Sequence, residues 1–273
     1  MGNSNLRKPA VAGQFYSSDS KKLKAELELL IDKGVKTRDV IACVMPHAGY
    51  MYSGRVAGET ISNINIKDKV IILGPNHTGY GKSFGIVTEG TWEMPFGSVD
   101  IDSGLASKLL QNSRYLEEDA VSHLYEHSLE VELPFLQYFK KEFKIVPITV
   151  SSDSIKIYQE IGREIAKVIN DSDLQKSILI IASSDMTHYE SQAQAEKKDR
   201  EAIQAILDLN EERLMEKINR FNISMCGYGP VAIMIACAKL LGARKAELIK
   251  YQTSGDITQD YSSVVGYAGI IIY

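Results

Sequence analysis

Short apolar runs rich in β-branched residues are the feature that most constrains the fold of this chain. They lie at 40–45, 69–73, 84–88, 143–150, 177–182, 246–251 and 267–273. Their nearly continuous apolarity is typical of strands that are buried on both faces of a sheet. Segments with helical spacing of apolar residues fall between them, most clearly at 154–170, 191–209 and 229–242. Strands that alternate with helices predict an α/β fold, with a mainly parallel central sheet flanked by helices.

Nothing in the sequence marks a domain boundary, so we expect a single domain over residues 1–273. The net charge of −4 gives no general electrostatic support for binding nucleic acid. No apolar stretch reaches the ~18 residues of a membrane span, and the N-terminal segment lacks the apolar core of a signal peptide. Three cysteines are too few for a disulfide framework. We therefore expect a cytoplasmic protein that binds neither nucleic acid nor membranes.

Polar side chains follow three of the predicted strands at equivalent places. They are His47 after strand 40–45, His77 after strand 69–73, and Asp185 and His188 after strand 177–182. In parallel sheets the carboxyl ends of the strands meet at one edge, and ligands bind in the crevice beyond it. Neighbouring strands are only about 4.8 Å apart, so their loops can meet at a metal-sized point. The pattern predicts one shared functional site, with His77 as a metal ligand or catalytic base.

Cys226 adds a sulfur atom as a candidate for the same site. It precedes the predicted helix 229–242 in the segment "ISMCGYGPVAIMI". A helix N-terminus lowers the pKa of a thiol and favours the thiolate, which is the form that binds metals. The residues alone leave open the alternative that Cys226 is a small buried apolar residue. Cys43 and Cys237 lie inside a predicted strand and a predicted helix, which indicates core positions.

The segment "HLYEH", residues 123–127, allows two further interpretations. It fits the H-x-x-E-H signature of inverted zinc peptidases, in which His123 and His127 would hold zinc and Glu126 would act as the base. The motif is short, and no distinct third ligand follows it. The alternative places His127 and Glu130 in the first turn of the next helix, where His127 either faces the substrate cleft or caps the surface.

Several longer motifs occur in a defined order from residue 7 to about residue 269. They are "RKPAVAGQFY", "MPHAGYMYSG", "LGPNHTGYG", "WEMPFGSVDID", "EHSLEVELPFLQ", "ASSDMTHY", "MCGYGPVAIMI" and "YQTSGDITQDYSSVVGYAG". Through them the chain resembles the Memo-like family, also called AmmeMemoRadiSam system protein B. The fold of that family is similar to that of class III extradiol ring-cleaving dioxygenases.

The resemblance implies a nonhaem metal site in which His47, His77 and Cys226 bind a divalent ion. Iron or copper is favoured and zinc is possible. Asp185 and His188 match the family's "SSDxxHY" motif, whose histidine is the acid/base in the dioxygenases. Those enzymes bind iron with two histidines and one carboxylate, whereas a thiolate is softer and favours zinc, Cu(I) or a differently tuned iron. Cleavage of catechols therefore does not follow from the fold.

Two classes of function remain for this resemblance. The first is a metal-dependent redox or dioxygenase-like enzyme, in which His188 transfers a proton and Asp185 orients its imidazole. The second is a non-catalytic module or adaptor that binds a metal, a small molecule or a peptide in the same cleft. The family name also implies a functional link to radical-SAM and AMMECR-type proteins. The zinc peptidase of residues 123–127 is the third and most remote class.

Overall fold

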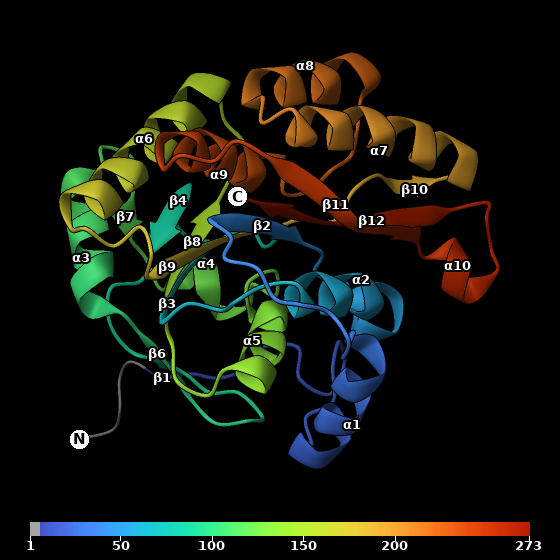
Figure 1. Cartoon of the computed structure of the whole chain (residues 1–273), viewed down its shortest axis with the longest axis horizontal. Helices are drawn as coiled ribbons and strands as arrows, with labels where there is room; N and C mark the ends of the chain where they lie inside the picture. The colour runs from blue at the N-terminus through green and yellow to red at the C-terminus, as the bar shows by residue number, and fades with distance from the viewer. Residues whose placement is uncertain (1–5) are drawn as a thin grey trace.

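The computed structural model describes residues 6–273, so the first five residues of the segment searched for a signal peptide lie outside it. A mixed sheet of 12 strands runs through the centre of the molecule (Figure 1). The strands are β1 Leu6–Arg7, β2 Ala42–Met45, β3 Lys69–Pro75, β4 Phe84–Ile86, β5 Thr91–Trp92, β6 Val99–Ile101, β7 Glu117–Glu118, β8 Lys144–Val150, β9 Ile178–Ser183, β10 His188–Glu190, β11 Ala246–Thr253 and β12 Val264–Ile272.

The middle of the sheet is parallel, as predicted. Its four central strands lie in the order β8, β3, β9, β2, and each pair is parallel. Beyond β2 the long C-terminal strand β12 is antiparallel, and it pairs with both β10 and β11. All seven apolar runs form strands. Strands β1, β5, β6, β7 and β10 were not predicted, because two or three residues are too short to show a period.

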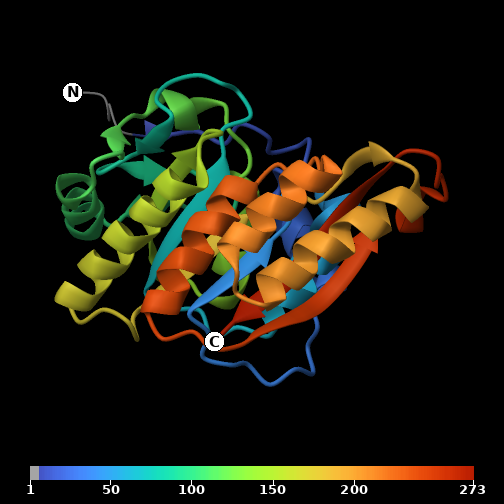
Figure 2. The same ribbon diagram turned by 90° about the horizontal axis from the view of Figure 1, so that it is seen from above.

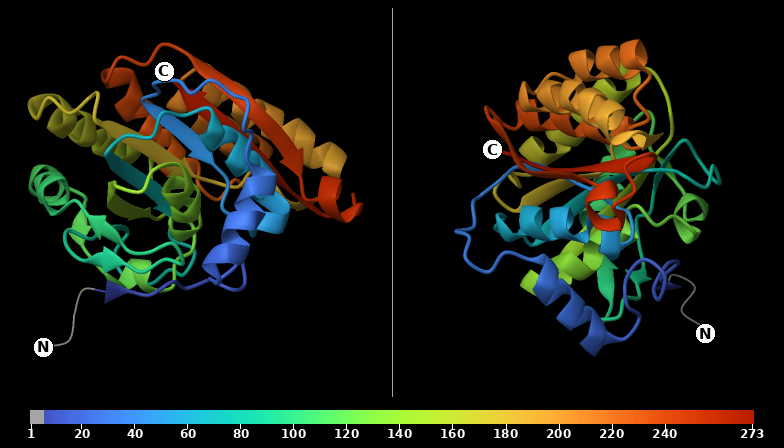
Figure 3. Two further views of the ribbon diagram at one scale, coloured as in Figure 1. Left: turned by 60° about the horizontal axis from the view of Figure 1, so that its bottom comes forward. Right: turned by 90° about the vertical axis from the view of Figure 1, so that its right-hand side faces the viewer.

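Helices cover both faces of the sheet (Figures 2 and 3). The helices are α1 Ser20–Leu30, α2 Tyr50–Ser62, α3 Ser103–Asn112, α4 Val121–Leu124, η1 Glu130–Glu132, α5 Leu133–Phe139, α6 Ile155–Asp171, α7 Gln192–Leu207, α8 Glu211–Phe221, α9 Tyr228–Leu240 and α10 Gly255–Thr258. Helices α1, α2 and α5 pack against one another on one face of the sheet. Helices α6 to α9 lie on the other face. The chain is therefore one α/β domain with a sheet between two helical layers.

Helix α9 is apolar on nearly all sides because it is enclosed. It contacts α6 and α8 laterally and β2, β3 and β9 beneath. Its residues from Gly229 to Ala238 are all buried. A helix that is apolar all round needs such a setting. The N-terminus of α9 consequently points to a fixed place beside the carboxyl ends of the central strands.

The helix that contains Pro134 starts late, after a separate short turn. A 3₁₀ turn, η1, precedes α5, and Pro134 is the second residue of α5. Proline is tolerated there because the first backbone N–H groups of a helix have no partner within it. Among the described residues, no helix is both long and apolar enough to cross a bilayer.

Candidate metal centre

Three neighbouring parallel strands end at one edge of the sheet and deliver three of the predicted residues. His77 follows β3, Asp185 follows β9 and His47 follows β2, each two residues beyond the strand end. Because β9 lies between β3 and β2, the three loops are neighbours. Cys226 reaches the same edge from the turn before α9. Residues that are 179 positions apart in sequence are thereby in contact, with 3.2 Å between Cys226 Sγ and His47 Nε2.

His47, His77 and Cys226 form a group that could hold a metal ion. Their candidate ligand atoms all lie within 4.8 Å of one another. The ring centroids of His47 and His77 are 5.0 Å apart, in an edge-on arrangement. Ligand atoms that share one ion lie about 2.0–2.3 Å from it, so these separations fit a single ion. Two imidazoles and one sulfur suit zinc, copper and iron.

The His47 ring is held by a buried chain of polar groups. Its Nδ1 lies 2.7 Å from Ser183 Oγ, which is also 2.7 Å from the carbonyl oxygen of Ser128 and 2.9 Å from Glu132 Oε1. The hydroxyl has one proton, and the Ser128 carbonyl can only accept, so that proton lies between them. His47 Nδ1 and Glu132 Oε1 must then both donate to Ser183. This leaves the lone pair on His47 Nε2 free to bind a metal.

The same count of protons requires Glu132 to be a neutral carboxylic acid. Its side chain is fully buried, and its Oε2 has no hydrogen-bond partner among the described residues. Burial, more than any other cause, raises the pKa of Glu132 well above its ordinary value, and the Asp185 carboxylate adds to the effect. A neutral acid avoids the cost of an uncompensated buried charge.

Glu126 holds the second histidine. Its carboxylate is buried and accepts from His77 Nδ1 at 2.9 Å and from the backbone N–H of His77 at 2.6 Å. The backbone N–H groups of His127 and Ser128 also donate to it. Although burial opposes ionisation, the hydrogen bond from His77 and the backbone hydrogen bond from Ser128 lower the pKa of Glu126 to about 2. His77 therefore carries its proton on Nδ1, which leaves Nε2 for the ion.

Cys226 is a thiol rather than a thiolate in the metal-free protein. Burial, followed by the charge of Asp185, raises the pKa of its thiol. Our expectation that the helix N-terminus lowers this pKa is therefore wrong, because desolvation of the charged form outweighs the helix. The turn is tight: a Cβ on Gly227 would lie 2.3 Å from the Ser183 carbonyl oxygen. Glycine after Cys226 is thus needed for the sulfur to approach β9.

Asp185 and His188 lie beside the group but do not contact each other by a hydrogen bond in the described structure. Asp185 Oδ1 accepts the backbone N–H of His47 at 2.9 Å, and the Asp185 N–H donates to Cys226 Sγ. His188 Nδ1 instead lies 2.9 Å from the Ser224 carbonyl oxygen. The orienting contact that we expected from Asp185 thus comes from Ser224. Burial raises the pKa of Asp185 to about 6.

The two histidines of "HLYEH" lie apart. Helix α4 ends at Leu124, so His123 and His127 do not share a helix face. His123 is buried, with Nε2 3.0 Å from the Gly85 carbonyl oxygen. The metal-capable groups of the described chain include His77, Glu126 and His127 but not His123. The geometry therefore gives no support to the zinc-peptidase interpretation. Glu130, placed by the second interpretation in the first turn of the next helix, is fully buried.

His127 lies beside the metal-capable group. Its ring stacks on His77 with 4.7 Å between centroids, and it also contacts the ring of Phe15. Burial lowers the pKa of His127, which favours the neutral ring. The group of His77, Glu126 and His127 overlaps the first one. Since the Glu126 carboxylate already accepts four hydrogen bonds, it is better placed to orient His77 than to bind an ion itself.

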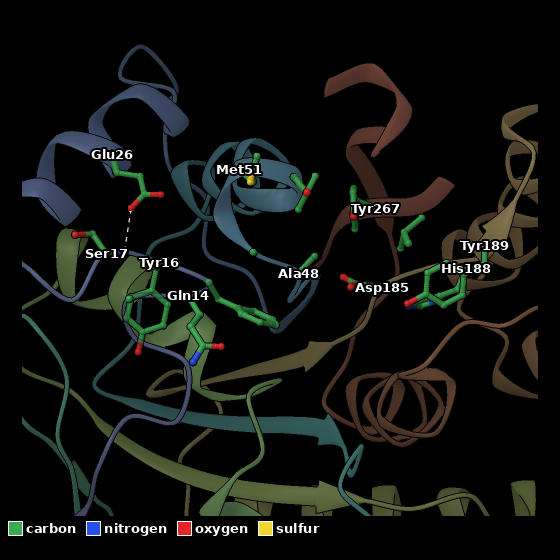
Figure 4. A pocket seen from close by; sticks show the side chains of 15 residues that line it. Gln14, Tyr16, Ser17, Glu26, Ala48, Met51, Asp185, His188, Tyr189 and Tyr267 are labelled. Atoms are coloured by element: carbon green, nitrogen blue, oxygen red, sulfur yellow. Dashed lines mark hydrogen bonds between the residues drawn. The ribbon is translucent and has the colours of Figure 1, made fainter. Parts of the chain in front are cut away.

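Two cavities flank the metal-capable group. The larger, of about 520 Å³, is a cleft whose lining includes Asp185, His188, Ala48 and Phe15 (Figure 4). The smaller, of about 260 Å³, is lined by His77 and Cys226 among others. Clefts of roughly 300–1,000 Å³ hold small molecules in proteins. The larger cleft is therefore the candidate substrate site, and its lining includes Ala48, the residue after His47, and Asp185, which accepts the His47 N–H.

Comparison with known proteins shows to which protein family the chain belongs. The profile of the family described as "Memo-like protein" matches residues 7–271. The chain belongs to the Memo-like family. A MEMO1 family protein of Aquifex aeolicus is 45% identical over 97% of this chain and 98% of its own length. One from Methanopyrus kandleri is 42% identical, with the same coverage.

A solved structure supports the fold. The crystal structure of the uncharacterized protein JW3007 from Escherichia coli K12 aligns with a TM-score of 0.57 at 13% identity. The alignment covers 84% of this Memo-like chain and 98% of that one. Identity at this level supports the arrangement of elements and carries no statement about activity.

Sequence reasoning missed Ser183, Glu132 and Ser224. Ser183 ends an apolar run, and a hydroxyl in such a place was a usable signal that a polar partner lies beside the strand end. Glu132 stands in "EVELPF", where glutamates alternate with apolar residues. That pattern resembles an amphipathic surface helix, so its burial was not foreseeable. Ser224 acts through its backbone carbonyl, which no sequence pattern reveals.

Proposed function

We propose that this Memo-like protein is a metal-dependent redox enzyme, dioxygenase-like in the wide sense, that acts on an organic substrate in the larger cleft. The observation that carries the proposal is the adjacency of two things: a His–His–Cys group with ligand atoms within 4.8 Å, and a cleft of about 520 Å³ that Asp185 and His188 line. When bound, iron or copper would supply the redox chemistry, and zinc would supply a Lewis acid.

The chain's own residues would bind, orient and move protons. His188 donates a hydrogen bond from Nδ1–H to the Ser224 carbonyl oxygen. The lone pair on its Nε2 is therefore free to accept a proton from a substrate hydroxyl. Asp185 fixes the backbone of His47 and contacts the Cys226 sulfur, which holds two of the proposed ligands together. The His127 ring stacks on His77 and also contacts Phe15, which lines the cleft.

The cellular setting is a proposal of the same kind. Three free thiols, Cys43, Cys226 and Cys237, suit a reducing compartment such as the cytoplasm. A joint role with radical-SAM and AMMECR-type proteins rests on the family resemblance alone. The thiol in the proposed ligand set is vulnerable to oxidation, which a reducing compartment would limit.

The test begins with protein purified without oxygen and loaded separately with iron, copper and zinc. Oxygen uptake is then measured with a panel of catechols and thiols. We expect uptake that His47→Ala abolishes and that His188→Ala lowers about 10²–10⁴-fold with the metal retained. His123→Asn is the matched control, because His123 lies outside the group, and it should retain both metal and uptake if it folds.

Other outcomes contradict the proposal. Tight binding of metal without any consumption of oxygen or reductant would favour the non-catalytic module. Loss of metal in His123→Asn, with metal retained in His47→Ala, would restore the zinc peptidase. Full turnover in His188→Ala would remove His188 from the reaction.

A further inference from the structure

The larger cleft contains negative charge and no fixed positive charge. None of the described residues that line it is a lysine or an arginine, whereas two, Glu26 and Asp185, carry carboxyl groups. Figure 4 places Glu26 beside Tyr16 and Ser17, and Asp185 with His188 across the cleft from them. The cleft therefore has an acid at the end away from the metal-capable group as well as one beside it.

Glu26 is free to take a ligand. It lies on α1 and is half-buried, and its Oε2 accepts the backbone N–H of Ser17 at 3.2 Å. In the part of the chain that the structure describes, no lysine, arginine or histidine forms an ion pair with it. A carboxylate that is partly withdrawn from water and lacks a cation attracts one more strongly than a fully solvated carboxylate does.

The walls between the two ends are aromatic. Phe15, Tyr16, Tyr52, Tyr189 and Tyr267 contribute five rings to the lining. Ring faces bind other aromatic groups and also attract cations through their negative quadrupole. An anionic ligand would find neither a lysine nor an arginine here and would face the Glu26 carboxylate, so its loss of water would not be compensated.

We propose that the cleft binds an elongated ligand with an aromatic ring at the metal end and a positively charged amine at the Glu26 end. This inference rests on the proposed function only in calling the ligand a substrate. The binding preference itself does not depend on any reaction. Ligands of the same shape that end in a carboxylate or a phosphate are rejected. Glu26 acts as a specificity residue and takes no part in the chemistry.

The test measures binding without turnover. Isothermal titration compares tyramine with p-hydroxyphenylpropionic acid, which replaces the amine by a carboxylate, and repeats the comparison with longer-chain homologues. Metal-free and zinc-loaded protein are both used, because zinc performs no redox step. We expect the amines to bind about tenfold or more tightly than the acids, and the difference to shrink as salt is raised.

Three variants assign the preference to Glu26. Glu26→Gln keeps an oxygen for the Ser17 N–H and should bring the ratio of affinities close to one. Glu26→Lys should reverse the preference in favour of the acids. Glu28→Gln is the matched control: it lies on the same helix but does not line the cleft, and it should leave the ratio unchanged.

Equal affinity for amines and acids in the unmodified protein would overturn the inference, as would failure of every homologue to bind. A preference that survives in Glu26→Gln would overturn the role of Glu26. An amine preference in a protein that consumes no oxygen with any metal would refute the proposed redox function and leave this inference standing.

Discussion

Ser183 and Glu126 determine which nitrogen each proposed histidine ligand presents. Ser183 accepts a hydrogen bond from Nδ1–H of His47, and Glu126 accepts one from Nδ1–H of His77. Both contacts are made away from the ion, yet they fix tautomer and ring orientation. Substitution of such orienting residues typically lowers metal affinity by about 10–100-fold. They are therefore the first single residues to test.

Glu126→Gln should weaken zinc binding by about 10–100-fold. The amide would place an N–H group against one of the four N–H donors that now point at the carboxylate, and His77 would lose its anchor. Competition with a chromophoric chelator measures the affinity. Glu93→Gln on the exposed surface is the control. An unchanged zinc affinity in Glu126→Gln would refute the orienting role.

Glu132→Gln should become more stabilising as the pH rises. Because the folded pKa of Glu132 is raised, its contribution to stability is complete below the unfolded pKa of about 4.3 and is lost as the pH rises through the folded value. Glutamine keeps a donor for Ser183 and does not titrate. Between the unfolded pKa and the raised folded pKa, the variant should therefore gain on the wild type by up to about 1.4 kcal/mol per pH unit.

Urea unfolding of both proteins at several pH values between about 5 and 8 checks this prediction. In this range the difference in free energy of unfolding should grow as the pH rises. The quantity to compare is the difference in free energy of unfolding between the two proteins. A difference that stays constant across the range would mean that Glu132 is not a raised acid. Infrared detection of a protonated carboxyl band that Glu132→Gln removes offers a separate measurement.

At the scale of elements, the segment from Glu126 to Glu132 is fixed by the N-terminal arm, residues 6–17. Glu130 is fully buried and accepts from Arg7 Nη1 at 2.8 Å and from Tyr16 Oη at 2.7 Å. The backbone N–H groups of Ala10 and Val11 also donate to it. Arg7 in turn donates to the backbone carbonyl oxygens of Glu126 and of His123, which lies just before the segment. The arm thereby positions the turn that carries Glu126 and His127.

Arg7→Met should destabilise the fold by about 3–5 kcal/mol, because it leaves the Glu130 carboxylate buried without its cation. The double variant Arg7→Met with Glu130→Gln should recover part of that loss. Urea unfolding at pH 7 measures both. The surface pair of Arg38 and Glu247 provides the control, and Arg38→Met should cost under about 1 kcal/mol. Equal losses in Arg7→Met and Arg38→Met would contradict the argument.

Elements were predictable where many residues repeat one pattern. The runs at 69–73, 143–150 and 177–182 contain enough apolar residues to indicate burial on two faces, and all became central strands. The helices α6, α7 and α9 were recognised for the same reason. Strands β1 and β10 depend on partners distant in sequence, and the antiparallel direction of β12 depends on how the sheet closes. No local pattern encodes either.

Across the molecule, the site combines residues from the loops after β2, β3 and β9 and from the turn before α9, so an ion there would connect segments distant in sequence. Zinc at 100 times its Kd should add about 2.7 kcal/mol to the free energy of unfolding and raise Tm by about 5–10 °C. Scanning calorimetry measures the shift. It should vanish in His47→Ala and persist in Cys237→Ala. An equal shift in His47→Ala would place the ion elsewhere.

Zinc affinity should also rise with pH. Cys226 must release a proton to bind an ion, because its pKa is raised, whereas burial keeps His47 neutral already, with a pKa well below its ordinary value. Between about pH 6.5 and 8 the affinity should increase about tenfold per unit. Cys226→Ala should bind more weakly and lose this slope. A wild-type affinity that is independent of pH would show that the thiol is not a ligand.

The convergence of His47, His77 and Cys226 followed from strand ends and the resemblance, whereas the cleft did not. Its wall at the far end comes from the N-terminal arm and α1, which the sequence places nowhere near the central strands. The arm's position depends on the backbone hydrogen bond from Tyr50 to Phe15 and on buried Glu130. Contacts of that kind are decided by tertiary packing.

Because the arm supplies part of the cleft and none of the proposed metal ligands, the two halves of the site are separable by engineering. Residues 13–15 and 17 could be exchanged together while Arg7, Ala10, Val11 and the buried Tyr16 keep their bonds to Glu130. Libraries confined to those positions would vary the lining of the cleft and leave the three proposed metal ligands unchanged.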